Sequence, residues 1–372
     1  MKITIFSFVA TVIYSSSIIL LLYFLRTKAR LVSVCSTSNI VLLYMFCAIR
    51  LSLPLEFAWT LAVPMPVIIN PIYAVLKRRI SLGEAGSVKL YLVLAAVALL
   101  IALIKIIILI REYFKIYSTI VKFSKKRILK DNANRDLGKE NIEIRECEII
   151  GSPFSFGIFK KMILLPAKEY ETETEKLILM HEYMHHANRD LPVKMLTEIF
   201  VAIFWWNPIV YLLGKDLNQT FELRCDQKVV EKLDFQGRIK YLQVLLEEYK
   251  NADERALACG LGFSNSVTTF IEERFKEIKN FNAGKKKYGN CLVPIFFVVT
   301  FFLSYTVVFQ SQYKAPDGQM NTHYGEEVSR EKNYIYEYEK KYYISINNDL
   351  IEIDDDCLQD LLNDGFELKE GL

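Results

Sequence analysis

Four long runs of apolar residues lie along the chain, separated by charged stretches. They fall near residues 3–25, 39–59, 88–109 and 291–309. A helix needs about 20 apolar residues to cross the hydrocarbon core of a bilayer. The pattern therefore predicts a mainly α membrane protein with about four transmembrane helices, in which residues 1–110 form an N-terminal membrane region.

Basic residues flank these runs unevenly, and this predicts an orientation. Lysine and arginine cluster at residues 26–30, 111–130 and 285–287, and the positive-inside rule places such loops in the cytoplasm. Residues 310–372, with 15 acidic and 6 basic residues, then form a short acidic extracellular tail. A smaller basic cluster at residues 77–79 opposes this topology.

Composition narrows the class of protein further. Apolar residues make up 52% of the chain, which is high for a soluble protein. The seven cysteines are scattered and form no C-x-x-C pair, which excludes a disulfide framework and a cysteine zinc site. We therefore expect a multi-pass protein of the cell membrane.

The segment between the third and fourth runs has the pattern of a folded domain. Residues 115–140 are basic and polar and predict a connector. Residues 141–150 alternate as in a strand, and residues 156–166 predict a second strand that ends at a proline. Apolar residues then recur at helical spacing over residues 172–190. We expect residues 111–290 to form a cytoplasmic α+β domain.

Three of the four histidines lie in HEYMHHANRD, residues 181–190. His181 and His185 are four positions apart and share one helical face, so both imidazoles can reach one metal ion. Glu182 lies beside this face, where it can take a proton from water. H-E-x-x-H is the signature of zinc metallopeptidases. The alternative is an amphipathic helix with exposed histidines, which the scarcity of histidine in this chain disfavours.

A catalytic zinc ion needs a third protein ligand, and no further histidine lies nearby. Glu222 and Asp226 are four positions apart on a later helix. We predict that Glu222 is the ligand and that Asp226 accepts the second N–H of a zinc-bound histidine. A solvated acidic helix face explains the same spacing equally well. Asp190 is either a second such acceptor or a helix cap, and His186 faces away from the metal.

Residues 191–217, between the two motifs, are apolar enough for a fifth span. A single crossing would place His181 and Glu222 on opposite sides of the membrane, and the ligand set could not close. We therefore predict a hairpin that breaks at Asn207-Pro208 and is either buried or skirts the membrane.

The ordered set of these segments resembles the BlaR/MecR-type antirepressor metallopeptidases, which are membrane proteins of gluzincin type. The matching segments are SPFSFGIFKKMILLP (152–166), HEYMHHANRD (181–190), FWWNP (204–208) and ELRCD (222–226). The resemblance implies that His181, His185 and Glu222 bind one zinc ion. It also implies that Glu182 is the catalytic base.

The resemblance implies a biological role as well. The chain would be a zinc metalloendopeptidase with a cytoplasmic active site that transduces a signal and acts on a cytoplasmic repressor or similar regulator. The strand at residues 156–166 would offer an edge to an extended substrate peptide. Better-known members carry an outside β-lactam-binding domain after the fourth span, and we expect residues 310–372 to be too few to form one.

Two other functions fit the same residues. One is a housekeeping membrane metalloprotease, and the other is a non-cleaving membrane sensor or scaffold, which the intact Glu182 disfavours. The expected partners are membrane lipid, one Zn2+ ion per chain, a cytoplasmic protein substrate such as a transcriptional repressor, and a second copy of the chain in a homodimer. Direct binding of nucleic acid is not expected.

Overall fold

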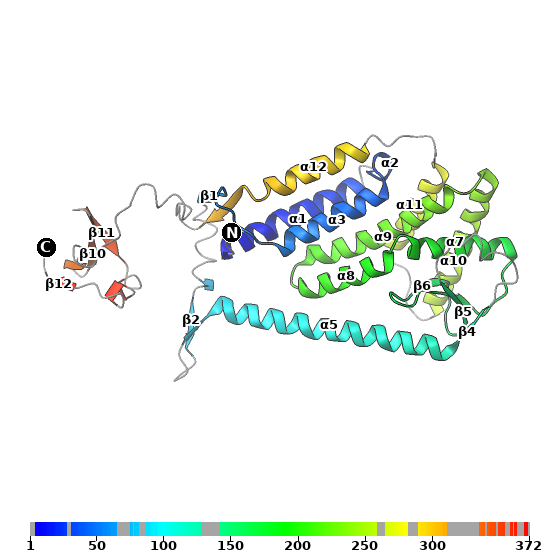
Figure 1. Ribbon diagram of the computed structural model, residues 1–372, viewed down its shortest axis with the longest axis horizontal. Coiled ribbons are helices and arrows are strands. Elements are labelled where there is room, and N and C mark those ends of the chain that lie inside the picture. Colours follow the sequence, from blue (N-terminus) through cyan, green and yellow to red (C-terminus); the bar gives the residue numbers. More distant parts are fainter. Residues whose placement is uncertain are drawn as a thin grey trace.

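A computed structural model of the chain shows a mainly helical protein with small sheets (Figure 1). The residues that it describes are 4–27, 31–64, 75–76, 78–81, 87–127, 142–258, 265–281, 289–310, 335–338, 341–346, 349–353, 358–359, 361–362 and 368–370. The basic residues at 28–30 and 285–287, and most of the 310–372 tail, lie outside the described residues.

Two described helices are long and apolar enough to cross a membrane, namely α1 (Ile5–Thr27) and α5 (Leu90–Phe123). Two shorter apolar helices, α3 (Thr37–Ser52) and α12 (Gly289–Leu303), overlap the second and fourth apolar runs. α3 ends before Pro54, because proline disfavours a helix interior. The number of four spans therefore stays a prediction.

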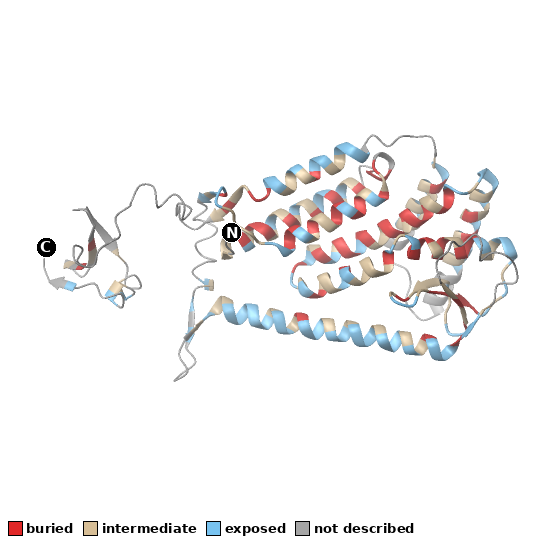
Figure 2. Ribbon diagram, viewed as in Figure 1, coloured by how far each residue is buried: buried red, intermediate tan, exposed pale blue. Residues whose placement is uncertain are grey.

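α5 is longer than the sequence pattern predicted. It has 34 residues and continues through Phe123, into the 115–140 segment that was expected to be a connector. Most of its surface is exposed, as expected for a helix that faces lipid (Figure 2). Its last turns are held because Ile120 is buried against Cys147 and Leu164 on one face of a sheet.

A helical hairpin packs beside the membrane helices. In this hairpin, α9 (Pro208–Val230) packs against α1 and α3, and α8 (Asp190–Ile203) packs against α9 and α5 (Figure 1). The hairpin breaks at Asn207, as predicted, and the Asn207 side chain caps α9 by accepting a hydrogen bond from the Ile209 N–H at 3.0 Å. The helices share one apolar core, which includes Ile19, Leu22, Leu43, Leu213 and Phe221.

A four-stranded sheet lies next to the histidine helix α7 (Thr172–Ala187). Its strands, in spatial order, are β4 (Ser124–Lys126), β5 (Glu143–Cys147), β7 (Met162–Pro166) and β6 (Phe154–Phe156). β7 pairs in parallel with β5 and antiparallel with β6, so β7 is an inner strand.

The expectation that residues 156–166 form one edge strand is therefore wrong. The chain turns back at Gly157, whose φ of 92° is accessible to glycine at little cost. A Cβ atom there would lie 1.9 Å from the Lys160 carbonyl oxygen. This turn divides the segment into two strands, and among the described residues the outer strand on this side is β6.

The remaining described elements include a small parallel pair of strands, one of which follows α12, and a sheet in the tail. β8 (Val307–Gln310) pairs in parallel with β1 (Leu61–Pro64), so the last part of the 291–309 run is a strand and not helix. Further elements are α2 (Leu31–Val34), β2 (Arg79–Ser81), β3 (Ser87–Lys89), α10 (Phe235–Ala258), α11 (Asn265–Lys279), β9 (Ile335–Tyr338), β10 (Lys341–Ile346), β11 (Asp349–Ile353) and β12 (Leu368–Glu370). In the tail, β9 to β12 form one sheet.

Leu164 tests the packing between α5 and the sheet. Its side chain is fully buried, so Leu164→Ala should lower the free energy of unfolding by about 2–5 kcal/mol through a cavity. Leu99→Ala is the matched control, because Leu99 is 62% exposed on α5 and should change stability by less than about 0.5 kcal/mol. Thermal unfolding in detergent measures both, and equal melting of the two variants would contradict this packing.

Candidate metal centre

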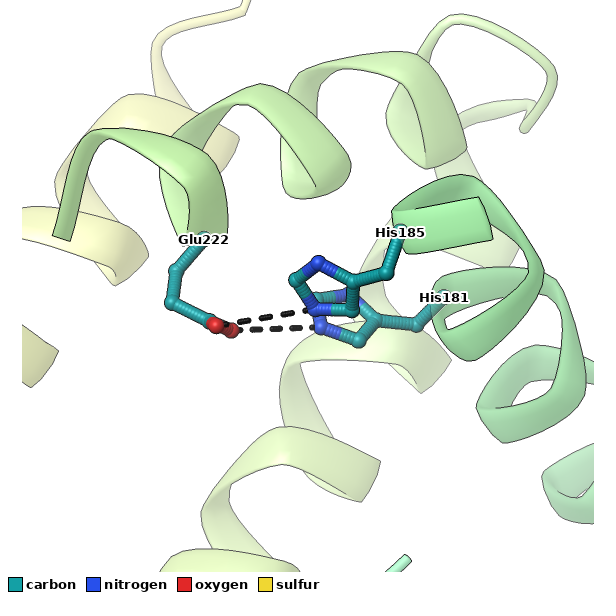
Figure 3. Close-up of side chains that lie close together, drawn as sticks. All are labelled: His181, His185 and Glu222. Carbon is teal, nitrogen blue, oxygen red and sulfur yellow. Dashed lines mark ion pairs between the residues drawn. The ribbon is translucent and has the colours of Figure 1, made fainter. Parts of the chain in front are cut away.

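α7 presents two imidazoles on one face. His181 and His185 are one turn apart, and their ring centroids are 5.1 Å apart with an angle of 85° between the ring planes. Both residues are buried. Both rings direct their Nε2 atoms toward α9 (Figure 3). Local helical geometry therefore accounts for two of the three predicted ligands.

α9 supplies the third group. Glu222 Oε2 lies 3.4 Å from His181 Nε2, and Glu222 Oε1 lies 3.5 Å from His185 Nε2 (Figure 3). The candidate ligand atoms of the three residues lie within 4.8 Å of one another. Two ligands that each lie about 2.0–2.1 Å from a tetrahedral zinc ion are about 3.3 Å apart. The spacing of these three groups therefore fits one zinc ion.

The other ring nitrogen of each histidine has a partner. His185 Nδ1 lies 2.8 Å from Asp190 Oδ2. His181 Nδ1 lies 2.7 Å from the Tyr241 hydroxyl, which in turn donates to Asp226 Oδ1 at 2.7 Å. With protons on both Nδ1 atoms, both Nε2 lone pairs are directed at Glu222 and are available to a metal.

The sequence pattern predicted a direct contact between Asp226 and a histidine. Asp226 Oδ1 is 3.4 Å from His181 Nδ1, and Tyr241 of α10 provides the shorter contact between the two residues. Asp226 is held from the other side by Arg274 of α11, whose Nε and NH2 donate at 2.7 and 2.8 Å. Asp190 accepts in the same way from Arg224. Both buried carboxylates are thus neutralised by an arginine.

The charges around the centre shift its pKa values in opposite directions. Burial lowers the pKa of His185, but the Glu222 charge and a hydrogen bond with Asp190 outweigh this and raise it well above its usual range. The pKa of His181 is also raised, since hydrogen bonds to Asp226 and Glu222 outweigh burial. Burial raises the pKa of Glu222, but the charge of His185 and hydrogen bonds to both histidines outweigh it and hold the pKa well below its usual range.

Glu182 lies next to the two histidines and contacts the outer strand. The Ser155 hydroxyl of β6 is 2.7 Å from Glu182 Oε2 and 2.7 Å from the Glu182 carbonyl oxygen. His186, which was expected to face away from the metal, is buried and bonds the Met162 carbonyl oxygen of β7 at 3.0 Å. These contacts fix α7 on the sheet beside the strand edge.

A second group of potential ligands shares His185 with the first and consists of His185, Asp190 and Cys225. Cys225 Sγ lies 3.3 Å from both His185 Nδ1 and Asp190 Oδ2. Burial raises the pKa of the Cys225 thiol to about 12, so this sulfur stays protonated near neutral pH. The second group has a single imidazole, and its Asp190 already accepts from Arg224, so the first group is the better match to a catalytic zinc site.

Sequence reasoning missed Tyr241, Arg274, Ser155 and Arg224. Tertiary packing brings each of these residues to the metal centre, and none of them belongs to the H-E-x-x-H motif. Two of them lie within segments quoted above: Ser155 in residues 152–166, and Arg224 in ELRCD, between Glu222 and Asp226.

Comparisons with known proteins find one matching family model and several similar proteins. The family model described as BlaR1 peptidase M56 matches residues 6–278. Regulatory protein BlaR1 of Bacillus licheniformis is 27% identical over 146 residues, which cover 38% of this chain and 24% of that protein. Methicillin resistance mecR1 protein of Staphylococcus aureus is 28% identical over 172 residues, which cover 44% of this chain and 29% of that protein.

A third relative, regulatory protein BlaR1 of Staphylococcus aureus, is 27% identical over 181 residues, or 47% of this chain and 30% of that protein. The matched part of the chain therefore spans less than a third of the length of each of these relatives. The range matched by the family model, residues 6–278, contains the metal centre and the helices beside it.

The raised histidine pKa values predict how zinc binding depends on pH. Zinc competes with protons for both imidazoles, so the apparent affinity should fall as the pH drops through the raised pKa values, and this fall should begin at a higher pH than for ordinary imidazoles. The carboxylate of Glu222 should not contribute to this pH dependence, because its pKa is lowered and it stays ionised. Chelator competition at pH 8, 7 and 6, corrected for protonation of the chelator, measures this, and a constant affinity would contradict the histidine ligands.

Proposed function

The chain belongs to the BlaR1 peptidase M56 family, and from this premise we propose that it is a membrane zinc endopeptidase that transduces a signal. The observation that carries the proposal is the convergence of His181, His185 and Glu222, with Glu182 beside them. Two histidines and one carboxylate leave an open position, which is the donor set of a catalytic zinc ion.

The proposed reaction is hydrolysis of a peptide bond. Zinc, when bound, supplies a Lewis acid that polarises the peptide carbonyl and makes water more acidic. Glu182 is the general base, and Ser155 occupies its Oε2 atom at 2.7 Å, so that Oε1 is available to take the proton from the attacking water. Glu182 then gives this proton to the nitrogen of the leaving amine.

The outer strand β6 is the proposed binding edge for the substrate. An extended peptide can add to an open strand edge through main-chain hydrogen bonds. Ser155 of β6 contacts Glu182, so a peptide on this edge would pass next to the catalytic base. This favours an extended or locally unfolded segment of a protein as substrate.

We also propose that the metal centre is cytoplasmic and that α3 and α12 complete four spans. In support, α3 packs against α1, α12 packs against α3, and Phe297 of α12 is buried in the core of that bundle. The proposed substrate is a cytoplasmic regulator such as a transcriptional repressor. The names of the relatives, a regulatory protein and a resistance protein, support a role in signalling.

The roles of Glu182 and His185 can be separated by substitution. Glu182→Gln should keep about one zinc ion per chain and lose cleavage by about 10²- to 10⁴-fold, because the base is removed while the ligands remain. His185→Ala should lose both. Metal analysis of detergent-purified protein gives the zinc content, and proteomics of cells with each variant identifies proteins that persist only when cleavage is lost.

Glu173→Gln is the control, because Glu173 is an exposed glutamate on the same helix and should behave as wild type. Normal signalling by Glu182→Gln would contradict the peptidase and favour a non-cleaving scaffold.

A further inference from the structure

A buried arginine joins the membrane helix α1 to the helices of the metal centre. Arg26, in the last turn of α1, is only 2% exposed. Its Nε donates to Asp216 Oδ1 of α9 at 2.6 Å, and its NH2 donates to Gln219 Oε1 of α9 at 2.7 Å. Its NH1 reaches both oxygens of Glu273 of α11 at 2.9 and 3.1 Å. One guanidinium thus binds α9 and α11 at the same time.

Each partner of Arg26 is close in sequence to a residue of the metal centre. Gln219 lies one helical turn before Glu222 on α9. Glu273 directly precedes Arg274 on α11, and Arg274 holds Asp226 and lies 3.9 Å from Glu222 Oε2. A displacement of Arg26 would therefore act on Glu222 in two ways, through Gln219 on the same helix and through Arg274 on α11.

The second membrane-side helix of the bundle joins the same network. The Tyr44 hydroxyl of α3 donates to Asp216 Oδ2, the oxygen that Arg26 Nε leaves free. Tyr44 and Asp216 are both buried. Breaking a network of buried charges is costly, while its net contribution to stability is small. The contacts of this network link α1 and α3 to α9 and α11.

We propose that Arg26 is a positioning residue of the metal centre, through which the position of α1 and α3 in the membrane controls zinc binding and peptidase activity. The inference rests on the proposed function and names the regulation of that site. A signal that shifts α1 relative to α9 would change the distance of Glu222 from the two histidines. Lysine cannot replace Arg26, because a single ammonium group does not provide the planar fork that reaches both helices.

Arg50 provides a matched control. It is also 2% exposed and lies in the same bundle, on α3. Its Nε donates to Ser304 Oγ at 2.6 Å, its NH2 donates to the Ser304 carbonyl oxygen at 2.9 Å, and its NH1 donates to Thr11 Oγ1 of α1 at 2.5 Å. Arg50→Lys therefore disturbs a buried arginine of the bundle whose hydrogen bonds go to other groups than those of α9 and α11.

The experiment compares zinc affinities of the detergent-purified full chain by chelator competition, alongside thermal unfolding. Arg26→Lys should weaken zinc binding about 10-fold, at the lower end of the range for groups that support metal ligands. Arg50→Lys should bind zinc as tightly as wild type, although its melting temperature should change by about as much as that of Arg26→Lys. Glu273→Gln, at a partly exposed position, should also weaken zinc binding and serves if Arg26→Lys does not fold.

The outcomes separate this inference from the proposed function. If wild type binds zinc and the Arg26, Glu273 and Arg50 variants all match it, the function stands and the positioning role is wrong. An equal loss of zinc affinity in Arg50→Lys would also overturn the positioning role, since the effect would then reflect bundle stability alone. If wild type binds no zinc, both proposals fall.

Discussion

The packing of α9 against α7 is the contact on which the rest of the structure depends. α7 carries two imidazoles, and α9 brings the carboxylate that closes the set. The two helices share an apolar core, in which Leu177 and Met184 of α7 lie with Val229 of α9. Hydrophobic burial is non-directional, so this core supplies the attraction between the helices. The hairpin at Asn207 and the Arg26 network then fix their register.

Several carboxylates lie close together around the metal centre, and burying a carboxylate is unfavourable unless it is paired with a positive charge and hydrogen-bonded. Asp190 and Asp226 each meet an arginine, and Glu222 lies near Lys194 and the two histidines. The raised pKa values of the histidines and the lowered pKa of Glu222 have the same cause, which is the attraction between the imidazolium groups and the Glu222 carboxylate. A divalent cation would replace the protons on these histidines as the partner of Glu222.

Features that depend on short-range geometry could be predicted from the sequence. The four-residue spacing of His181 and His185 defines one helical face, and the Asn207-Pro208 pair defines the hairpin. Spacing alone left Glu222 undecided, and only the ordered family segments favoured it. Tyr241 could not be predicted, because its contact with His181 joins residues 60 positions apart. The sheet edge was misplaced because a single glycine turn divides residues 156–166, and the helical pattern of α5 was masked by its basic residues.

X-ray absorption at the zinc edge of the purified full chain tests the central claim most directly, because it reports the atoms bound to the metal. The account predicts two imidazole nitrogens at about 2.0–2.1 Å together with oxygen ligands at about 2.0–2.2 Å. A sulfur atom at about 2.3 Å would instead place the metal on Cys225 and contradict the account, as would a spectrum with no imidazole contribution.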